Sequence, residues 1–415
     1  MSARLHNPAV VTDFLTPGIG QIHSLHLAGV DVVSVAPRKP LHLCLARFSR
    51  LTRRHVTAAG WGVDDWVAAL EALARDFDGK GVLFPSHDDH VEMMMAARER
   101  LADRYHVPVA PHLGQEFFEK NWQYALADRV GAPTPRYTTF TGGDDPDIRQ
   151  FRFPLILKPS SRLGEAAVEV FRLRVLLSME ELEKTLEELR TEHRGRLFQI
   201  AENIPGGPDH LWTVGAYSNR EGRVLRTFTG RKLSQHPYTH GIASVAESIE
   251  APAEAVEHAR ALLEGARFHG ISQVEFKFDE RDKQFKFLEI NPRAWAWVKL
   301  AAFSGVNLPL IQYYDLLGDP RLAETIARPQ RYDSFFVNEH YVILNDMAEE
   351  RALIQRLGRE RQMVRGMGLD GELALPAVAW SLAHAKRIRQ SLFGGDQRGA
   401  NIEDSTDGKD NKDAN

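Results

Sequence analysis

The chain has a single cysteine, Cys44, among its 415 residues. One cysteine cannot form an intrachain disulfide, and it excludes a cysteine-based zinc cluster or a dithiol redox pair. Charge of one sign is not in excess either, since 52 Lys and Arg stand against 56 Asp and Glu and the formal net charge is −4. The protein as a whole therefore has no electrostatic attraction to nucleic acid or anionic membranes, and any basic site must be local.

Long apolar runs are missing as well. Residues 1–11 contain no apolar stretch long enough for a signal peptide, and no uncharged run elsewhere reaches the roughly 18 residues of a membrane span. We therefore expect no transmembrane segment, no nucleic-acid partner and a cytoplasmic location. With 43% hydrophobic and 26% charged residues, the chain can instead bury sizeable cores in two or three domains.

The first part of the chain alternates strand and helix signals. Apolar strands are indicated at residues 9–12, 30–35 and 81–85, with an amphipathic helix after the first. This order predicts a small open α/β domain over residues 1–115. Pro17-Gly18-Ile19-Gly20 is typical of a tight turn; its glycines could also hold a phosphate, but the full dinucleotide-binding fingerprint is missing.

The next part of the chain predicts an α+β region that begins with a helix near Gln115, which residues 131–135 end. Strands are expected at 153–159, 196–201, 211–217, 224–229, 272–279 and 284–290, and a helix at 178–191. The polar turns 219–222 and 280–283 predict antiparallel hairpins. Beyond residue 326 the pattern is mixed, and it becomes helical at 378–393. This helix is expected to pack onto the rest of the protein, with binding to a membrane surface as the alternative. Residues 394–415 are predicted to be a disordered tail.

The strongest chemical signal is the pair of strands around Glu275 and Glu289. Period-2 alternation puts Glu289 on one face with Asn291 and Arg293, and a hairpin would bring Glu275 to the same place. Two carboxylates and an amide oxygen suit Mg²⁺, which retains waters and bridges substrate phosphates. Arg293 would then neutralise charge on a transferring phosphoryl group, although an ordinary charged hairpin edge is the alternative.

Glu275 together with Leu288-Glu289-Ile290-Asn291-Pro292-Arg293 resembles the metal-binding signature of ATP-grasp enzymes. Other pieces follow in the order of that family: Lys120 ahead of residues 131–135, Lys158 in an apolar strand, and the segment 200–206. The stretch 230–233, followed by Pro237 and Gly241, resembles the carboxylate-amine ligase branch that includes D-aspartate ligase.

The resemblance covers most of residues 1–325 and implies an α/β N-terminal open-sheet domain followed by an α+β ATP-grasp domain. We expect the first domain at 1–115 and the second at 116–325, with ATP between a lid lobe at about 116–200 and a metal-binding lobe at about 201–325. A short helical C-terminal extension would occupy 326–393.

The resemblance also implies site residues. ATP and Mg²⁺ (or Mn²⁺) are the expected cofactors, with the metal held by Glu275, Glu289 and Asn291. The nucleotide would be bound by Lys120, Lys158, Ser160, Ser161, Glu202, Asn203, Ile204 and Asp209. The loop 160–165 departs from the family because it has one glycine, Gly164, where a lid rich in glycine and serine is usual; Ser160 and Ser161 can still donate to phosphate.

Two further polar segments have competing interpretations. Arg231 and Lys232 could hold a substrate carboxylate or stabilise an acyl phosphate, with Arg293 as the third catalytic cation, or they could belong to a solvated basic loop. The segment 86–90 follows a strand end, where open α/β sheets place ligands. These residues could form a metal site of His87, Asp88 and His90, but consecutive residues point in different directions. Helix capping by Asp88 or Asp89 is the simpler explanation.

The resulting hypothesis is an ATP-dependent ligase that activates a carboxylate as an acyl phosphate and transfers it to an amine. Its partners would be small-molecule carboxylate and amine substrates, and the resemblance allows a homodimer. The alternatives are another ATP-grasp reaction, such as carboxylation or phosphorylation of an acceptor, and a non-catalytic ATP-binding protein.

Overall fold

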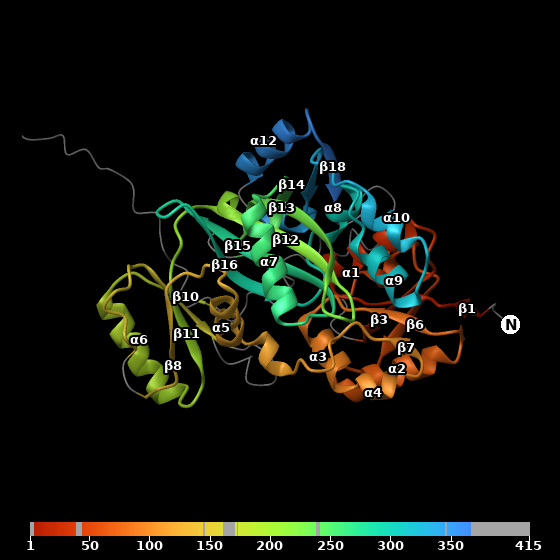
Figure 1. The fold of residues 1–415 in the computed structure, drawn as a ribbon, viewed down its shortest axis with the longest axis horizontal. Helices are drawn as coiled ribbons and strands as arrows, with labels where there is room; N and C mark the ends of the chain where they lie inside the picture. Colours follow the sequence, from red (N-terminus) through yellow and green to blue (C-terminus); the bar gives the residue numbers. More distant parts are fainter. Residues whose placement is uncertain are drawn as a thin grey trace, which may run out of the picture.

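The computed structural model describes residues 4–38, 44–143, 146–160, 171, 173–237, 241–344 and 347–366. The predicted helix 378–393, the predicted tail 394–415 and most of the loop 160–165 lie outside these ranges. Besides a two-stranded pair, the described chain forms a five-stranded sheet, a four-stranded sheet and, between them in Figure 1, a seven-stranded sheet. None of the described helices is long and apolar enough to cross a bilayer.

The N-terminal sheet is parallel, with strand order β4-β3-β2-β6-β7. Its strands are β2 (Ala9–Thr12), β3 (Val32–Pro37), β4 (Arg54–Ala58), β6 (Gly81–Phe84) and β7 (Tyr105–His106). A parallel pair of β1 (Leu5–His6) and β5 (Phe77–Asp78) lies beside it. The helices of this part are α1 (Leu15–His26), α2 (Val63–Ala74), α3 (Asp88–Ala96) and α4 (Arg98–Leu101), with a 3₁₀ turn at Ala46–Phe48. The predicted open α/β architecture is confirmed.

Gly18 and Gly20 lie inside α1, so the predicted turn at residues 17–20 is wrong. Close packing explains the two glycines. A Cβ on Gly20 would lie 2.9 Å from Val298 Cγ1, and one on Gly18 would lie 2.5 Å from Asp13 Oδ1. The glycines therefore let α1 approach its neighbours, and no phosphate-binding turn forms there.

The four-stranded sheet, hereafter the small sheet, is antiparallel, with order β10-β9-β11-β8. Its elements are β8 (Tyr137–Phe140), β9 (Leu155–Pro159), β10 (Arg174–Leu176), α6 (Met179–Glu192) and β11 (Phe198–Glu202). It follows a 3₁₀ turn at Gln115–Phe118 and helix α5 (Lys120–Val130). The small sheet has its own apolar core, in which Leu182, Leu186 and Leu189 of α6 pack on Leu155, Leu157 and Phe198.

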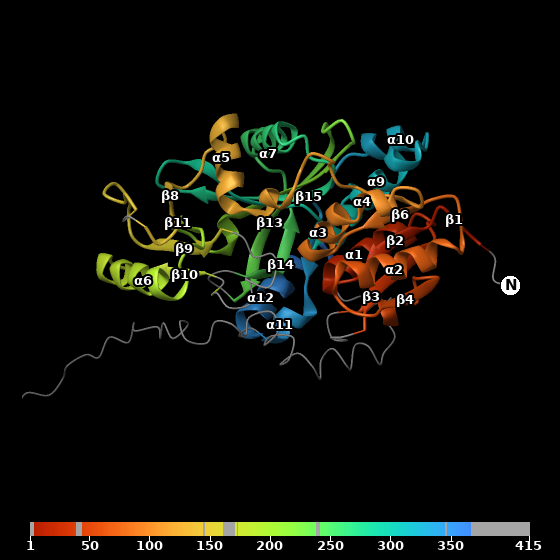
Figure 2. The same ribbon diagram turned by 90° about the horizontal axis from the view of Figure 1, so that it is seen from below.

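The seven-stranded sheet, hereafter the large sheet, has the order β16-β15-β12-β13-β14-β17-β18. Its strands are β12 (Leu211–Ser218), β13 (Val224–His236), β14 (Ile242–Ser248), β15 (Gly270–Asp279), β16 (Gln284–Asn291), β17 (Ser334–Val337) and β18 (Gln362–Arg365). The turns predicted at 219–222 and 280–283 do join antiparallel neighbours, β12 to β13 and β15 to β16. Figure 2 shows α5 and α7 (Ala253–Gly265) on one side of this sheet, where they pack on a shared core.

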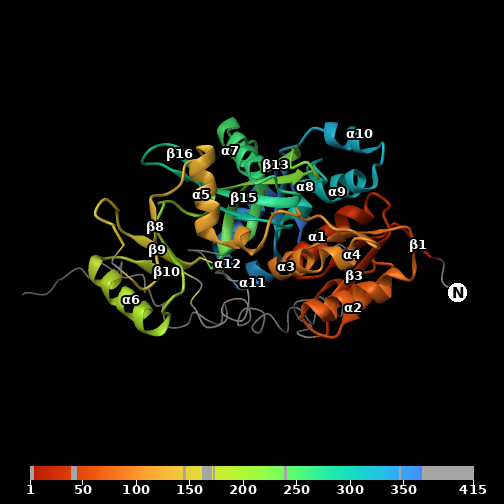
Figure 3. The same ribbon diagram turned by 60° about the horizontal axis from the view of Figure 1, so that its bottom comes forward.

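The chain after β16 connects the large sheet to the N-terminal sheet. It contains α8 (Val298–Phe303), α9 (Leu308–Leu317) and α10 (Leu322–Ala327), and α11 (Glu339–Leu344) and α12 (Met347–Leu357) follow β17. The described part of the predicted helical extension thus also supplies two strands, β17 and β18, to the large sheet. Figure 3 shows the N-terminal sheet and the small sheet at opposite ends of the molecule.

Candidate functional site

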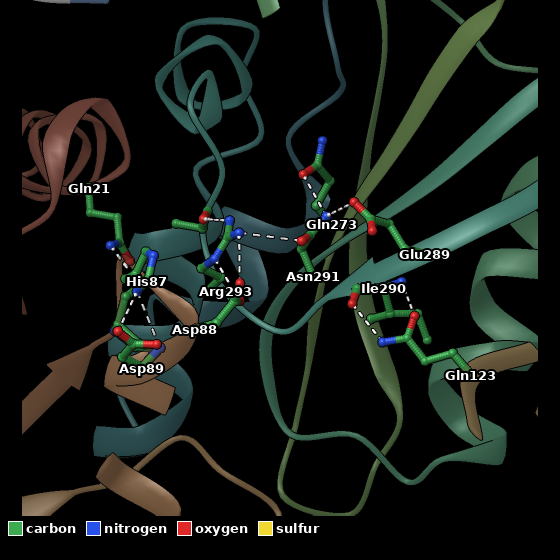
Figure 4. A network of polar contacts seen from close by, with 12 residues as sticks. Gln21, His87, Asp88, Asp89, Gln123, Gln273, Glu289, Ile290, Asn291 and Arg293 are labelled. Atoms are coloured by element: carbon green, nitrogen blue, oxygen red, sulfur yellow. Dashed lines mark hydrogen bonds and ion pairs between the residues drawn. The ribbon is translucent and has the colours of Figure 1, made fainter. Parts of the chain in front are cut away.

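The predicted metal ligands meet on one face of the hairpin formed by β15 and β16. Glu275 pairs directly with Glu289, and Gln273 pairs with Asn291, so all four side chains leave the sheet on the same side. Asn291 Nδ2 lies 3.3 Å from Glu289 Oε1 and 3.4 Å from Gln273 Oε1. Figure 4 shows Gln273, Glu289 and Asn291 of this group near Arg293. The structure therefore brings Glu275, Glu289 and Asn291 together.

Each glutamate of the pair is matched by a lysine from elsewhere in the chain. Lys120 Nζ lies 2.8 Å from Glu289 Oε2, and Lys232 Nζ lies 2.8 Å from Glu275 Oε1. The second pair is the more buried, with side chains 9% and 11% exposed. Since like charges directly opposite each other in a sheet repel, the two lysines balance a carboxylate pair that would otherwise destabilise the hairpin.

Lys120 is held at this place by its helix. Gln123, one turn later in α5, accepts a hydrogen bond from the backbone N–H of Ile290 at 2.8 Å and donates to the Ile290 carbonyl at 2.9 Å. The backbone N–H of Lys120 donates to the carbonyl of Ser160 at 2.9 Å. The first turn of α5 therefore joins the end of β9 in the small sheet to β16 in the large sheet.

Ser160 lies at this junction, directly after β9. Its Oγ is buried and has no hydrogen-bond partner among the residues that the structure describes. Lys158, two residues earlier, pairs with Gln199 of β11 in the sheet. Lys158 thus lies within the small sheet and Ser160 at its junction with α5, while Ser161 lies outside the described ranges.

Arg293 is held by Asp88, the first residue of α3. Its Nε donates to Asp88 Oδ1 at 2.8 Å and its Nη2 to Asp88 Oδ2 at 3.2 Å, and Nη2 lies 3.4 Å from Asn291 Oδ1. Burial raises the pKa of Asp88, but the charges of Arg293 and His87 and the hydrogen bonds from Arg293 outweigh it, so this pKa lies below its usual value.

The donor set fits a divalent cation. Two carboxylates and one amide oxygen on one face are hard ligands of the kind that Mg²⁺ or Mn²⁺ takes together with water and phosphate oxygens. A cation would also relieve the repulsion between Glu275 and Glu289, which Lys120 and Lys232 now balance. The described residues contain no group of three His, Cys, Asp or Glu that could hold a metal, so Asn291 would have to complete the set.

The predicted adenine-binding segment follows β11, between the small and large sheets. The Glu202 carboxylate accepts a hydrogen bond from the Arg152 N–H at 3.1 Å and lies 3.8 Å from Arg281 Nη1 and 4.0 Å from Arg136 Nε. The Asn203 N–H donates to the Pro154 carbonyl at 3.0 Å, and Ile204 is buried. The carboxylate of Glu202 is thus already occupied by cationic groups.

Asp209 lies further along, in the 3₁₀ turn Pro208–His210 before β12. Its Oδ1 is 3.0 Å from His210 Nδ1. Asp209 also acts on Lys277, whose pKa burial lowers to about 8, while the charges of Asp209 and Asp279 raise it. The structure therefore places Asp209 near a buried amine for which the sequence predicted no role.

Arg231 is not brought to this cluster, although its neighbour Lys232 is. The predicted strand 224–229 continues to His236 as β13, and successive residues of a strand point to opposite faces. Arg231 Nη2 lies 2.6 Å from Glu247 Oε1, and its guanidinium carbon is 5.4 Å from the centre of the Trp212 ring. Glu247 also pairs with Arg361 at 2.8 Å, so Arg231 joins an ion-pair group around the buried Glu247 on the far face.

The segment 86–90 caps a helix and forms no metal site. His87 precedes α3, and its Nδ1 accepts a hydrogen bond from the Asp89 N–H at 3.3 Å. The capping residue is thus His87, and the prediction of Asp88 or Asp89 in that role is wrong. His90 is fully buried against Trp61 and Trp66, with ring centres 6.0 Å and 4.7 Å away.

Sequence reasoning missed Gln273 and the pairing of Asp88 with Arg293. Gln273 is buried, and its Nε2 donates to Thr213 Oγ1 at 3.1 Å while its Oε1 faces Asn291. Its position two residues before Glu275 places it on the same face by period-2 alternation, and that signal was available. The pairing of Asp88 with Arg293 joins residues 205 apart in the chain, and no local pattern predicts it.

Comparison with known proteins gives the same fold. A family model described as "ATP-grasp in the biosynthetic pathway with Ter operon" matches residues 213–340, which include the carboxylate hairpin. This stretch of the chain is thus similar to the ATP-grasp family. The chain is also 21% identical over 303 residues to a D-aspartate ligase of Enterococcus faecium, covering 68% of this chain and 70% of that protein.

Solved structures resemble the fold over most of the chain. An L-amino acid ligase from Bacillus licheniformis superposes with a TM-score of 0.53 at 16% identity, covering 76% of this chain and 75% of its own. A biotin carboxylase from Campylobacter jejuni gives a TM-score of 0.58 at 13% identity over 79% and 74% of the two chains. These likenesses confirm the predicted fold class.

Proposed function

We propose that this protein is an ATP-dependent carboxylate-amine ligase that forms an amide through an acyl phosphate and releases ADP and phosphate. The observation that carries the proposal is the pair of glutamates on one hairpin face, each matched by a lysine, with Asn291 and Arg293 beside them. Such a cluster suits a triphosphate and its metal, because carboxylate and amide oxygens can ligate a divalent cation while the neighbouring cationic side chains can contact phosphate oxygens.

The site divides into parts with separate tasks. Lys120, Lys158, Ser160 and Ser161 would hold the phosphates, and residues 202–204 with Asp209 would hold the adenosine. Glu275, Glu289 and Asn291 would hold Mg²⁺, which when bound shields negative charge on the phosphate oxygens. The proposal includes the predicted lid lobe at about 116–200 and the predicted metal-binding lobe at about 201–325, with ATP between them.

The reaction requires positioning and charge neutralisation more than covalent chemistry by the protein. An oxygen of the substrate carboxylate attacks the γ-phosphorus, the bond from that phosphorus to the β–γ bridging oxygen breaks, and ADP leaves. The amine then attacks the carbonyl carbon of the acyl phosphate, the bond from carbon to the phosphate oxygen breaks, and the amine loses a proton. Arg293 and Lys232 would stabilise the transferring phosphoryl group and the acyl phosphate.

Amino acids are the first substrates to consider. The names D-aspartate ligase and L-amino acid ligase both belong to proteins that this chain resembles. We therefore propose an amino acid as the carboxylate, the amine or both, in a cytoplasmic enzyme that can act as a homodimer.

The test is Mg²⁺-dependent release of ADP and phosphate across a matrix of amino acids and small carboxylates. We expect release only when a carboxylate and an amine are both present. Glu289→Gln should abolish it, because the substitution keeps the side-chain shape and removes a proposed metal ligand. Glu257→Gln is the matched control, since Glu257 is exposed on α7, which packs on the opposite face of the large sheet.

Two results would contradict the proposal. Release that depends on bicarbonate and not on an amine would indicate a carboxylation reaction. ATP binding without turnover on any pair would favour a non-catalytic nucleotide-binding protein.

A further inference from the structure

Asp88 is the carboxylate that pairs with the guanidinium of Arg293 among the described residues, and it lies beside the N-terminal sheet. Asp88 is the first residue of α3, directly after the end of the sheet strand β6 and its short loop. The loop is well anchored: Gln21 donates to Ser86 Oγ at 3.1 Å, and the His87 ring lies 4.3 Å from that of Phe14. Figure 4 shows this contact between Asp88 of α3 and Arg293, which follows β16.

The hydrogen bonds of Arg293 fix the direction of its side chain. A guanidinium has five N–H donors in one plane. Asp88 accepts from Nε and Nη2, Asn291 Oδ1 lies 3.4 Å from Nη2, and the Ala294 carbonyl accepts from Nη1 at 3.1 Å. Within the described residues this leaves one N–H, on Nη1, for a ligand. A two-point contact with a carboxylate fixes the guanidinium plane as well as its position.

We propose that Asp88 is a positioning residue that orients Arg293 for the reacting phosphoryl group. The inference rests on the proposed function, in which Arg293 is the cation beside the transferring phosphate. Asp88 itself would touch neither ATP nor the acyl phosphate; it acts through Arg293. The N-terminal domain would thereby take part in the chemistry of a site whose metal ligands all lie on the large sheet.

The experiment compares kcat and KM for ATP in Asp88→Asn, Asp88→Glu and the parent protein, with the active pair of substrates. We expect Asp88→Asn to lower kcat by about 10- to 100-fold, the usual cost of losing a residue that orients a reacting group. KM for ATP should stay close to that of the parent, because the phosphate-binding lysines are unchanged. Asp88→Glu should recover part of kcat, since it keeps the carboxylate.

Asp89→Asn is the matched control. Asp89 is the next residue in the first turn of α3, it is half exposed, and its carboxylate lies 3.4 Å from the His87 ring. It removes the same charge from the helix N-terminus without touching Arg293, so kcat should be unchanged. In an Arg293→Ala background, Asp88→Asn should cause no further loss of kcat.

Two outcomes would overturn the inference. An Asp88→Asn protein with unchanged or higher kcat would show that Asp88 does not orient Arg293 for the reaction, or that it holds Arg293 back. The second is independent of turnover: if Asp88→Asn lowers Tm equally in the parent and Arg293→Ala backgrounds, the two side chains are not coupled. A parent protein that turns over no substrate pair would instead count against the proposed function.

Discussion

Lys232 Nζ lies 2.8 Å from Oε1 of Glu275, while Arg231, the residue before it, pairs with Glu247 on the other face of the same sheet. Both residues belong to β13, and the alternation of a strand sends consecutive side chains in opposite directions. Two neighbouring basic residues that look equivalent in the sequence therefore have different surroundings.

Substitutions at these two positions should separate catalysis from stability. Lys232→Met should lower kcat by about 10-fold or more, because it removes a cation from the reacting site. Arg231→Met should leave kcat unchanged and lower the free energy of unfolding by about 1–3 kcal/mol, the usual loss for hydrogen bonds to a charged group. Steady-state kinetics and urea unfolding of both variants give the measurement. Equal losses of kcat in two stably folded variants would contradict the assignment.

Lys120 should contribute to ATP affinity through its charge. Lys120→Met removes the partner of Glu289 and one proposed phosphate contact, so we expect the Kd for ATP to rise by about 10-fold, as for the loss of one charge-assisted hydrogen bond. Equilibrium titration with a non-hydrolysable ATP analogue measures the change. Lys184→Met, at an exposed position of α6, is the control and should bind as the parent does. The same affinity in both variants would remove Lys120 from the nucleotide site.

Asp13 should make stability depend on pH. It is fully buried, and burial raises its pKa to about 8, although the Ala46 N–H and Arg47 lower it. The folded state therefore retains a proton that the unfolded state releases, and the free energy of unfolding should fall as pH rises from about 4 to about 8.

Asp13→Asn should flatten that pH dependence, because an amide keeps the acceptor for the Ala46 N–H and has no proton to lose. Urea unfolding at several pH values checks the slope, with Asp31→Asn as a surface substitution for comparison. An unchanged slope in Asp13→Asn would show that Asp13 is already ionised in the folded protein.

Much of the site could be predicted because its signals are local. Period-2 alternation around Glu275 and Glu289 depends on strand geometry alone, and the two polar turns are sufficient to predict the antiparallel hairpins. The strand β13 was predicted too short, because Gly230 interrupts its pattern; a Cβ there would lie 2.7 Å from Trp297 and from the Glu247 carbonyl. That packing, like the contact of Asp88 with Arg293, depends on residues far away in the sequence.

The division of the apolar cores has a consequence for how ATP would reach the site. One core contains Ile19 and Ile22 of α1 together with Trp295 and Trp297 beside the large sheet, whereas the small sheet packs on a core of its own. Separating the N-terminal sheet and its helices from the large sheet would expose apolar surface that they share. Displacing the small sheet would expose much less apolar surface. We therefore expect nucleotide exchange to proceed by movement of the small sheet, while the side chains of Asp88 and Arg293 stay paired.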